Sequence, residues 1–367
     1  MRKQRGNGAM MSVSMADSFT LDASKTLGRG TITTVPFDLG ILIVNWNGGE
    51  CLDSLLESID RTRGNLRVMV IVVDNASTDD SPESVEKFIA SRLAGSGDLK
   101  VVLLRNKSNI GFSRANNQAF AALQSDAIGG APLILMLNND TRLMPESLQT
   151  MIRFMRENPN VVAAGPKVIG ADGESQPTGR SLPTTGALFY RVQFLKWTRL
   201  FRSAHRRYRR TNVQPATAAP IAQVAAAAMM LRAEAFNKCG GFDEKFTFGV
   251  EDVDLCARMR ELGQIYYIPE AIVEHRGKFS SHRNSLYVYS NYECGWARYL
   301  RKHHGLGVAL LYKFLVTLDM PVRVLMHATR LTFKRVKGRT DHVEKHRELL
   351  GVTAKFTLIG LPRLWFA

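Results

Sequence analysis

A strand, a polar loop and a helix follow one another four times in the first half of the chain. Continuous apolar runs at 39–45, 68–73, 101–104 and 133–137 are typical of strands that are buried on both faces. Each run is followed by a polar cluster and then by apolar residues at helical spacing. This alternation predicts βαβ units, and therefore an α/β fold with a mainly parallel sheet flanked by helices.

The polar clusters stand at or just beyond the carboxyl ends of these strands. They occupy residues 45–49, 74–81, 109–117 and 138–140. A single turn rich in Asn and Asp is mostly turn chemistry. In an open α/β sheet, however, ligands bind at the carboxyl edge of the strands, so clusters far apart in the sequence meet at one place. The sequence therefore predicts one ligand site at this edge.

An acidic stretch opens another predicted helix further along the chain. Three carboxylates fall within residues 251–254, just before apolar residues spaced by four and three positions. Glu251 and Asp252 thus occupy the first turn, where free N–H groups and the helix dipole favour an anion. A carboxylate held ionised on the rim of a fold is well placed to act as a general base. The alternative is simple capping, because acidic residues are common in first turns.

Asp140 and His275 are candidate ligands of a divalent cation. Asp140 follows a central strand, and a carboxylate beside a pyrophosphate is what a hard cation needs. His275 follows a short predicted strand and offers a nitrogen ligand to the same ion. The alternative is that His275 has a structural role, as a single histidine often has.

Together these clusters resemble the inverting glycosyltransferases of family 2, which have the GT-A, or nucleotide-diphospho-sugar transferase, fold. The resemblance covers about residues 37–300, and the order and spacing of its motifs are specific although each motif alone is weak. The matching motifs are 43–47, 73–79, 109–112 with Asn116, 137–140, 240–243, 251–255 and His275. Residues 45–47 and 74–77 look most like the bacterial rhamnosyltransferase branch, which uses dTDP-L-rhamnose. Related branches use UDP-galactofuranose or a UDP-hexose.

The resemblance implies a role for each matched residue. The nucleotide-sugar donor would be bound by Val44, Asn45, Asn47, Asp74, Asn75, Ser77, Gly111, Asn116, Asn138 and Asn139. Asp140 and His275 would hold Mg²⁺ or Mn²⁺, Asp252 would be the catalytic base, and Glu251 would help to place the acceptor. The implied reaction is a metal-dependent, in-line displacement with inversion. Its implied acceptor is a hydroxyl of a lipid-linked or oligosaccharide precursor in cell-surface polysaccharide synthesis.

Three features depart from the family pattern. Asn138 stands where many members have an acid, which leaves one carboxylate at the core of the metal motif. The stretch 225–228 is alanine where a glycine-containing stretch is usual before the acceptor site. The loop at 276–280 is more basic than usual, and Arg276 and Lys278 are expected to help neutralise a diphosphate, which would partly offset the missing acid.

The chain is strongly basic, with a formal net charge of +16 and a pI near 9.9. This balance favours an anionic partner: nucleic acid, an acidic membrane surface or a phosphate-bearing substrate. A non-enzymatic nucleic-acid-binding protein is the alternative from another class, but only 199–210 hints at such a module, so no nucleic-acid partner is expected. A sugar-nucleotide pyrophosphorylase would carry a glycine-rich loop after the first strand, where this chain has Asn-Trp-Asn-Gly-Gly. The four cysteines lack CxxC spacing, which favours a reducing cytoplasm.

We expect three parts along the chain: a disordered leader at 1–36, a GT-A domain at 37–300 and a basic amphipathic helical extension at 301–367. Within the domain, 170–220 is rich in Pro, Gly, Ser and Arg and is expected to be an irregular basic insertion, which would either touch an anionic ligand or remain solvated. No stretch has about 18 uninterrupted apolar residues, so no membrane span is predicted.

One face of the extension is polar. Asp319, Arg323, His327, Arg330 and Lys334 recur at spacings of four and three, so they share a face of one helix. A cationic amphipathic helix suits the surface of an anionic membrane. This would place the protein peripherally on the cytoplasmic face of the cell membrane. The alternative is a terminal helix packed on the core.

Overall fold

The computed structural model describes residues 37–92, 97–210, 215–277, 285–337 and 340–367. The predicted leader at 1–36 lies outside these residues. The main sheet is formed by β1 (Leu39–Asn45), β2 (Val68–Asp74), β3 (Leu99–Arg105), β4 (Leu133–Asn138), β5 (Thr141–Leu143), β6 (Val161–Ile169), β7 (Ser175–Gln176), β9 (Ala219–Ile221), β11 (Ala228–Arg232) and β12 (Gln264–His275).

The strand order along the sheet is β3-β2-β1-β4-β11-β6-β12-β5. The first four strands pair in parallel, as the repeated apolar runs predict. Beyond them the sheet is mixed, because β11 runs antiparallel to both β4 and β6. The prediction of a mainly parallel sheet thus holds for the first half. Two short strands were expected around 265–273, but the structure has the single strand β12, with an irregularity between Ile268 and Ile272.

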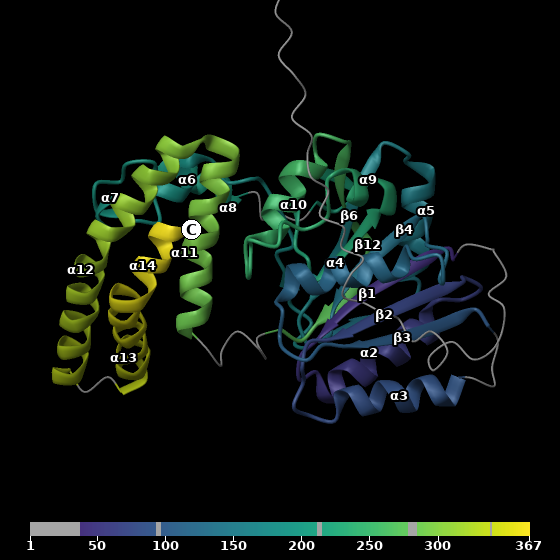
Figure 1. Ribbon diagram of the computed structural model, residues 1–367. Helices are drawn as coiled ribbons and strands as arrows, with labels where there is room; N and C mark the ends of the chain where they lie inside the picture. The colour runs from purple at the N-terminus through teal and green to yellow at the C-terminus, as the bar shows by residue number, and fades with distance from the viewer. Residues whose placement is uncertain (1–36, 93–96, 211–214, 278–284, 338–339) are drawn as a thin grey trace, which may run out of the picture. The chain divides into compact units, whose positions relative to one another are not determined.

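Helices cover both faces of the parallel half of the sheet (Figure 1). The helices α2 (Gly49–Thr62), α3 (Ser81–Arg92) and α5 (Ser147–Glu157) share one apolar core with β1 and β2. On the other face, α4 (Phe112–Leu123) packs against β1 and β2. It lies so close that a Cβ on Gly40 would be 2.2 Å from a methyl carbon of Leu123. The strand and helix pattern of 39–157 therefore matches the sequence prediction.

The stretch 170–220 contains short regular elements where the sequence predicts irregular chain. They include three helices and the strand β8 (Gly179–Arg180), which forms a two-stranded ribbon with β10 (Gln223–Val224), just beyond the stretch. The helices are α6 (Thr185–Phe189), α7 (Gln193–Trp197) and α8 (Arg202–Arg210). Elements of two to nine residues are too short to establish a hydrophobic period, so the sequence pattern does not reveal them.

The remaining helices are α9 (Ala233–Lys238), α10 (Glu251–Met259), α11 (Ser285–His304), α12 (Leu306–Val336), α13 (Thr340–Lys355), the π-helical turn η2 (Phe356–Gly360) and α14 (Leu361–Phe366). Residues of α6, α10, α11, α12, η2 and α14 form a second apolar core. Leu188, Val253, Trp296, Tyr312 and Phe356 all belong to this core. The expected domain boundary at residue 300 therefore falls inside α11, within one continuous cluster.

The polar face expected on the terminal helix is turned inward at Asp319, Arg323 and His327, whereas Arg330 is exposed. The Asp319 carboxylate is fully buried and accepts hydrogen bonds from the backbone N–H of Gln193 (2.7 Å) and from Nε of Arg323 (2.5 Å). His327 is also buried, whereas Leu325 and Phe333 are exposed. The predicted orientation toward a membrane is thus wrong for this part of α12. Spacing predicts which residues share a face of a helix, but not which face is buried. Burial depends on the neighbouring element, and here α7 contacts α12 on the Asp319 face.

One described stretch, Val343–Phe366, has the length and mean hydropathy (1.2) of a membrane-crossing helix. The sequence prediction of no span rested on the lack of an uninterrupted apolar run. About a fifth (22%) of the qualifying window is buried within the protein. Core helices of soluble proteins pass the same test, so this stretch is weak support for a crossing.

Gly249 holds the turn before α10, and substitution there is expected to destabilise the fold. Its φ is +86°, and a Cβ would be 2.6 Å from the Tyr292 ring. Gly249→Ala should lower the free energy of unfolding by about 2 kcal/mol, because it adds both backbone strain and overpacking. Thermal unfolding measures the loss. The matched control is Gly351→Ala in α13, where a Cβ meets open space and stability should be equal or higher. Equal melting temperatures for the Gly249 variant and the wild type would contradict the prediction.

Candidate active site

The register of the parallel strands brings the predicted polar residues to one edge. Asn45 at the end of β1 pairs with Asp74 at the end of β2, and Val44 pairs with Asn138 at the end of β4. The carboxyl ends of these strands therefore lie side by side, as the βαβ topology predicts.

Asn45 joins three of the loops at this edge. Its Nδ2 donates hydrogen bonds to Asp74 Oδ1 (2.9 Å) and to Ser81 Oγ (2.8 Å). Its Oδ1 accepts a hydrogen bond from Asn139 Nδ2 (3.0 Å). Asn45 and Asp74 are buried, so these bonds satisfy groups that would otherwise be costly to bury. In the structure Asn45 thus binds the loops to one another.

Asn75 holds the third loop. Its Nδ2 donates to Asn109 Oδ1 and its Oδ1 accepts from the Ile110 N–H, each at 3.0 Å. The next residue, Gly111, has a φ of +87° and no atom near the position of a Cβ. Asn116 is different: it is buried in α4, and its Nδ2 donates to the Phe112 carbonyl of the same helix at 3.0 Å.

Exposure divides the predicted donor-binding residues into two sets. Those buried are Asn45, Asp74, Asn75 and Asn116. Those half-buried at the edge are Val44, Asn47, Ser77, Gly111, Asn138 and Asn139. Asn47 and Ser77 are in contact, because the Asn47 N–H donates to Ser77 Oγ at 2.9 Å. The edge thus consists of a buried hydrogen-bonded layer beneath a half-exposed polar rim.

Asp140 and His275 are brought together from β4 and β12. His275 Nε2 lies 3.3 Å from Asp140 Oδ1, and Asn138 Nδ2 lies 3.4 Å from the same ring nitrogen. Gln176 holds the other side of the imidazole. Its Nε2 donates to the His275 carbonyl (2.8 Å), which places its Oε1 at Nδ1 (3.0 Å).

The Gln176 contact determines which ring nitrogen can act as a ligand. An amide oxygen accepts only, so Nδ1 carries a proton and Nε2 of the neutral ring keeps its lone pair. That lone pair and the Asp140 carboxylate are then adjacent and can both bind a cation, and the Gln176 oxygen at Nδ1 orients the ring as hydrogen-bond acceptors commonly do for metal-bound histidine. Within the described ranges, no cluster of three or more His, Cys, Asp or Glu side chains forms a fuller protein site. The residues present therefore fit a cation that takes its remaining ligands from a substrate or water.

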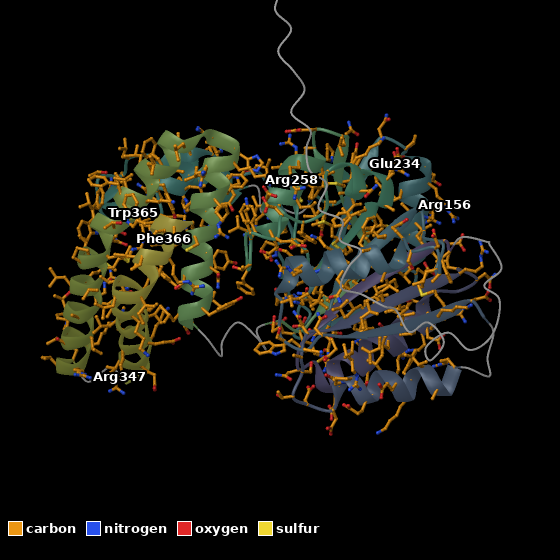
Figure 2. The ribbon with its side chains drawn as sticks, viewed as in Figure 1. Arg156, Glu234, Arg258, Arg347, Trp365 and Phe366 are labelled. Atoms are coloured by element: carbon orange, nitrogen blue, oxygen red, sulfur yellow. The ribbon has the colours of Figure 1, made fainter. Side chains whose placement is uncertain are left out.

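The acidic helix α10 places its three carboxylates in different surroundings. Glu251 is buried, and its Oε2 accepts from the Val250 N–H at 2.9 Å. Asp252 is half-buried, with an N–H···O bond from Val253 (2.8 Å). Asp254 is fully buried and pairs with Arg258 (2.8 Å) and Lys302 (3.0 Å). Asp254 therefore ties α10 to α11. Arg258 is labelled in Figure 2.

Burial is the main cause of the raised pKa values of the two carboxyl groups at the start of α10. Desolvation, together with the neighbouring Asp252 charge, raises the pKa of Glu251 to about 7, although hydrogen bonds from backbone amides lower it. Desolvation likewise raises the pKa of Asp252 to about 6, although hydrogen bonds from the Val253 and Ala226 amides and the Arg180 charge lower it. Carboxylates with pKa values near neutrality are suited to exchange protons at physiological pH.

A short backbone path links Asp252 to the strand edge. The Ala226 amide lies close enough to the Asp252 carboxylate to lower the pKa of that group. The carbonyl of the next residue, Ala227, accepts a 3.0 Å hydrogen bond from the Asn138 N–H. The alanine stretch 225–228 thus lies between the predicted base and the β4 loop.

Sequence reasoning missed Gln176, Arg180 and Gln223. Gln176 and Arg180 fall in the stretch expected to be irregular, and Gln223 follows just after it. Arg180 and Gln223 are paired on the β8–β10 ribbon, and both act on the Asp252 carboxylate, Arg180 by charge and Gln223 by a hydrogen bond. The sequence offers a signal only for Gln223, which is a single polar residue directly before the apolar stretch 224–231.

Two residues of the basic loop after His275 were also expected at the site. Arg276 is exposed, and its Nε lies 3.7 Å from Glu274. Lys278 lies outside the described residues.

The fold and this edge define the class of nucleotide-diphospho-sugar transferases. The family model described as glycosyl transferase family 2 matches residues 41–220, and a second, described as the N-terminal domain of galactosyltransferase, matches 206–282. The chain belongs to the family 2 glycosyltransferases with the GT-A fold.

Known relatives agree with this assignment. The chain is 27% identical over 280 residues to the N-acetylglucosaminyl-diphospho-decaprenol L-rhamnosyltransferase of Mycobacterium tuberculosis, covering 71% of this chain and 86% of that protein. It is 26% identical over 250 residues to the pre-mycofactocin glycosyltransferase of the same organism, covering 68% of this chain and 44% of that protein.

Two solved structures share the fold. Mannosyltransferase PcManGT from Pyrobaculum calidifontis, in complex with GDP-Man and Mn²⁺, has a TM-score of 0.52 at 15% identity, covering 89% of this chain and 88% of that one. GalNAc-T7 with UDP, GalNAc and Mn²⁺ has a TM-score of 0.51 at 14% identity, covering 72% of this chain and 48% of that one. At these identities the likeness concerns the fold alone.

Proposed function

We propose that the chain transfers a sugar from a nucleotide-sugar donor to a hydroxyl of a lipid-linked glycan precursor, with dTDP-L-rhamnose as the preferred donor. The observation that carries the proposal is the backbone path at 226–227, which joins the Asp252 carboxylate to Asn138 at the donor edge. Direct displacement of the nucleoside diphosphate by the acceptor hydroxyl requires a base close to the bound nucleotide sugar. The mycobacterial rhamnosyltransferase, whose named acceptor is a lipid diphosphate, supports the choice of donor and acceptor. UDP-galactofuranose or a UDP-hexose is the alternative donor.

Asp252 performs the proton transfer in this scheme. Its carboxylate takes the proton from the acceptor hydroxyl, whose oxygen attacks the anomeric carbon from the face opposite the diphosphate. The bond from that carbon to the diphosphate oxygen breaks, and the nucleoside diphosphate leaves with the electron pair. One displacement of this kind inverts the anomeric configuration. Glu251 already accepts hydrogen bonds from backbone amides, so it supports the start of α10 and places the acceptor only through that support.

The residues at the carboxyl edge of the sheet have different roles in donor binding. The half-buried rim, with Asn47, Ser77 and Asn139, contacts the nucleotide, and Val44 and Gly111 leave room for it. The buried Asn45, Asp74 and Asn75 hold the loops in place, and Asn116 acts within α4. Asp140 and His275 would hold Mg²⁺ or Mn²⁺, with Asn138 beside them. When bound, such a cation neutralises the diphosphate leaving group.

A lipid-linked acceptor requires the enzyme to work at a membrane. We place it in the cytoplasm, peripherally at the inner face of the cell membrane, where the positive net charge of the chain meets anionic lipid.

Isothermal calorimetry with dTDP-L-rhamnose and a panel of UDP-sugars, with and without Mn²⁺, tests the proposal. We expect Mn²⁺-dependent binding of dTDP-L-rhamnose, followed by transfer to an N-acetylglucosaminyl-diphospho-polyprenol acceptor. Preference for a UDP-sugar would overturn the rhamnose assignment but keep the reaction. Salt-dependent binding of DNA or RNA without binding of any nucleotide sugar would favour the nucleic-acid alternative.

Gln176 is expected to act on the cation through His275. Gln176→Leu removes the acceptor at Nδ1 and should weaken Mn²⁺ binding by about 10- to 100-fold. Gln176→Glu keeps an acceptor at Nδ1 but loses the donor to the His275 carbonyl, so its loss of affinity should be smaller than that of Gln176→Leu. Mn²⁺ titration of donor binding measures both variants. The matched control is Gln264→Leu. Gln264 is exposed at the start of β12, the strand that ends at His275, so this variant should bind Mn²⁺ normally. Normal Mn²⁺ binding by Gln176→Leu would contradict the prediction.

The rate should rise with pH across the acidic range. Because burial raises the pKa of Asp252 to about 6, the base holds its proton, and is inactive, below that pH. The value of kcat/KM should therefore climb through pH 6 to 7 and level off above it. A profile that is flat down to pH 5 would show that no carboxylate with a raised pKa limits the reaction.

A further inference from the structure

The exposed side of α12 is apolar. Leu310, Phe314, Leu318 and Leu325 are separated by four, four and seven positions, so they lie on one face of the helix. Together with Leu311 they are 43% to 66% exposed. We call these five residues the α12 stripe. No charged residue falls on this face between residues 307 and 329.

Exposed aromatic residues stand on two elements that contact α12. Trp197 ends α7, and Phe201 lies in the turn that follows it. Trp365 and Phe366 end α14 (Figure 2). Trp365 is attached to the helix, because its Nε1 donates to Thr317 Oγ1 at 3.1 Å. Phe366 is 91% exposed. Tryptophan and phenylalanine at the border of an apolar face are typical of proteins that lie in a membrane interface.

Basic residues predominate among the charges around the stripe, although α13, which packs on α12, also exposes Glu344 and Glu348. Residues 185–210, 306–337 and 355–367 contain a single acidic residue, Asp319, among many Lys and Arg. Asp319 is fully buried against Arg323, so these segments expose no carboxylate. A second copy of the same face would bring positive charge against positive charge, which disfavours a symmetric dimer. An anionic lipid surface complements both the charge and the apolar character.

We propose that the α12 stripe, with Trp197, Trp365 and Phe366, inserts into the surface of an anionic bilayer. The leucine and phenylalanine side chains enter the boundary of the acyl chains, and arginines such as Arg202 and Arg206 remain among the headgroups. The binding is interfacial, so it depends on apolar burial as well as on charge. This differs from the cationic face predicted by spacing, whose Asp319 and Arg323 are inside the protein. None of the proposed catalytic residues belongs to this surface, so either proposal can fail alone.

Flotation of the full chain with vesicles tests the proposal. We expect binding to vesicles of phosphatidylcholine with 30% phosphatidylglycerol that persists in part at high salt, because insertion of apolar side chains is not screened. The triple variant Leu310→Ser, Phe314→Ser, Leu318→Ser should partition at least about tenfold less. The matched control is Leu262→Ser, an exposed leucine just after α10, which should bind like the wild type. Transfer to a water-soluble acceptor should be equal in all three proteins, which also reports folding.

A second measurement needs no substitution in the stripe. Brominated lipids should quench the fluorescence of the wild type, and quenching should fall when Trp365 is replaced by Phe. Three outcomes would overturn the proposal: vesicle binding that is abolished by high salt and unchanged in the triple variant; a dimer that dissociates in the triple variant with no vesicle binding; or retention of the chain in membranes after an alkaline carbonate wash, which would indicate a crossing.

Discussion

Sugar transfer by the Asp252→Asn variant is expected to fall by about 10²- to 10⁴-fold, the range that a positioned general base contributes. The amide of this variant has the size of the carboxylate and can still contact the Gln223 side chain. It cannot take the proton from the hydroxyl of the sugar acceptor. Donor binding should be unchanged, because the loss concerns the proton transfer and not the nucleotide edge. Single-turnover rates with saturating donor, together with calorimetry of the donor, measure the two quantities separately.

Glu261→Gln is the matched control for this variant. Glu261 is exposed just beyond the end of α10, so the same chemical change there removes a carboxylate that contacts no substrate. Its rate should equal that of the wild type. Normal turnover of the Asp252→Asn variant would show that Asp252 is not the catalytic base. Glu251 would then be the candidate base, because burial also raises its pKa.

Asp140→Asn should lower turnover by about 10³-fold and weaken donor binding, because it removes the only carboxylate in the 138–140 motif. This chain has Asn138 where many family members are expected to have a second acid, so the 138–140 motif has no neighbouring carboxylate that can take over. The Asp140 oxygen lies 3.3 Å from His275 Nε2, and the loss leaves that nitrogen with the neutral Asn138 amide. Initial rates over a range of Mn²⁺ concentrations measure the effect.

Asp80→Asn provides the control, because Asp80 is an exposed carboxylate in the loop after β2 on the same edge. It should keep both the rate and the Mn²⁺ dependence. If the wild type transfers sugar at full rate in EDTA, or if Asp140→Asn does so in Mn²⁺, the assignment of Asp140 as a cation ligand is wrong.

Much of the fold and half of the site follow from the sequence, for a physical reason. Strands buried on both faces, such as 39–45 and 68–73, must be continuous and apolar, and the polar residues at their ends must then lie at one edge. The positions of Asn45, Asp74 and Asn138 follow from this rule. The alternation of short elements in 170–220 leaves no such pattern, so Gln176 and Arg180 were not found.

Only the tertiary structure decided which hydrogen-bond partner each polar side chain has and which face of a helix is buried. The residues Asn45 and Asn116 carry the same side chain, yet one joins three loops and the other bonds within its own helix. Spacing also placed Asp319 and Arg323 on one face of α12, but the N–H groups at the start of α7 turn that face inward and leave the leucines outside. Periodicity is a property of one helix, whereas burial depends on which neighbouring element offers the better hydrogen bonds and packing. For this protein the sequence alone therefore determined the parallel half of the sheet, the family and the line of polar strand ends. The packing of neighbouring elements determined the surroundings of Asp252 and His275 and the exposed face of α12.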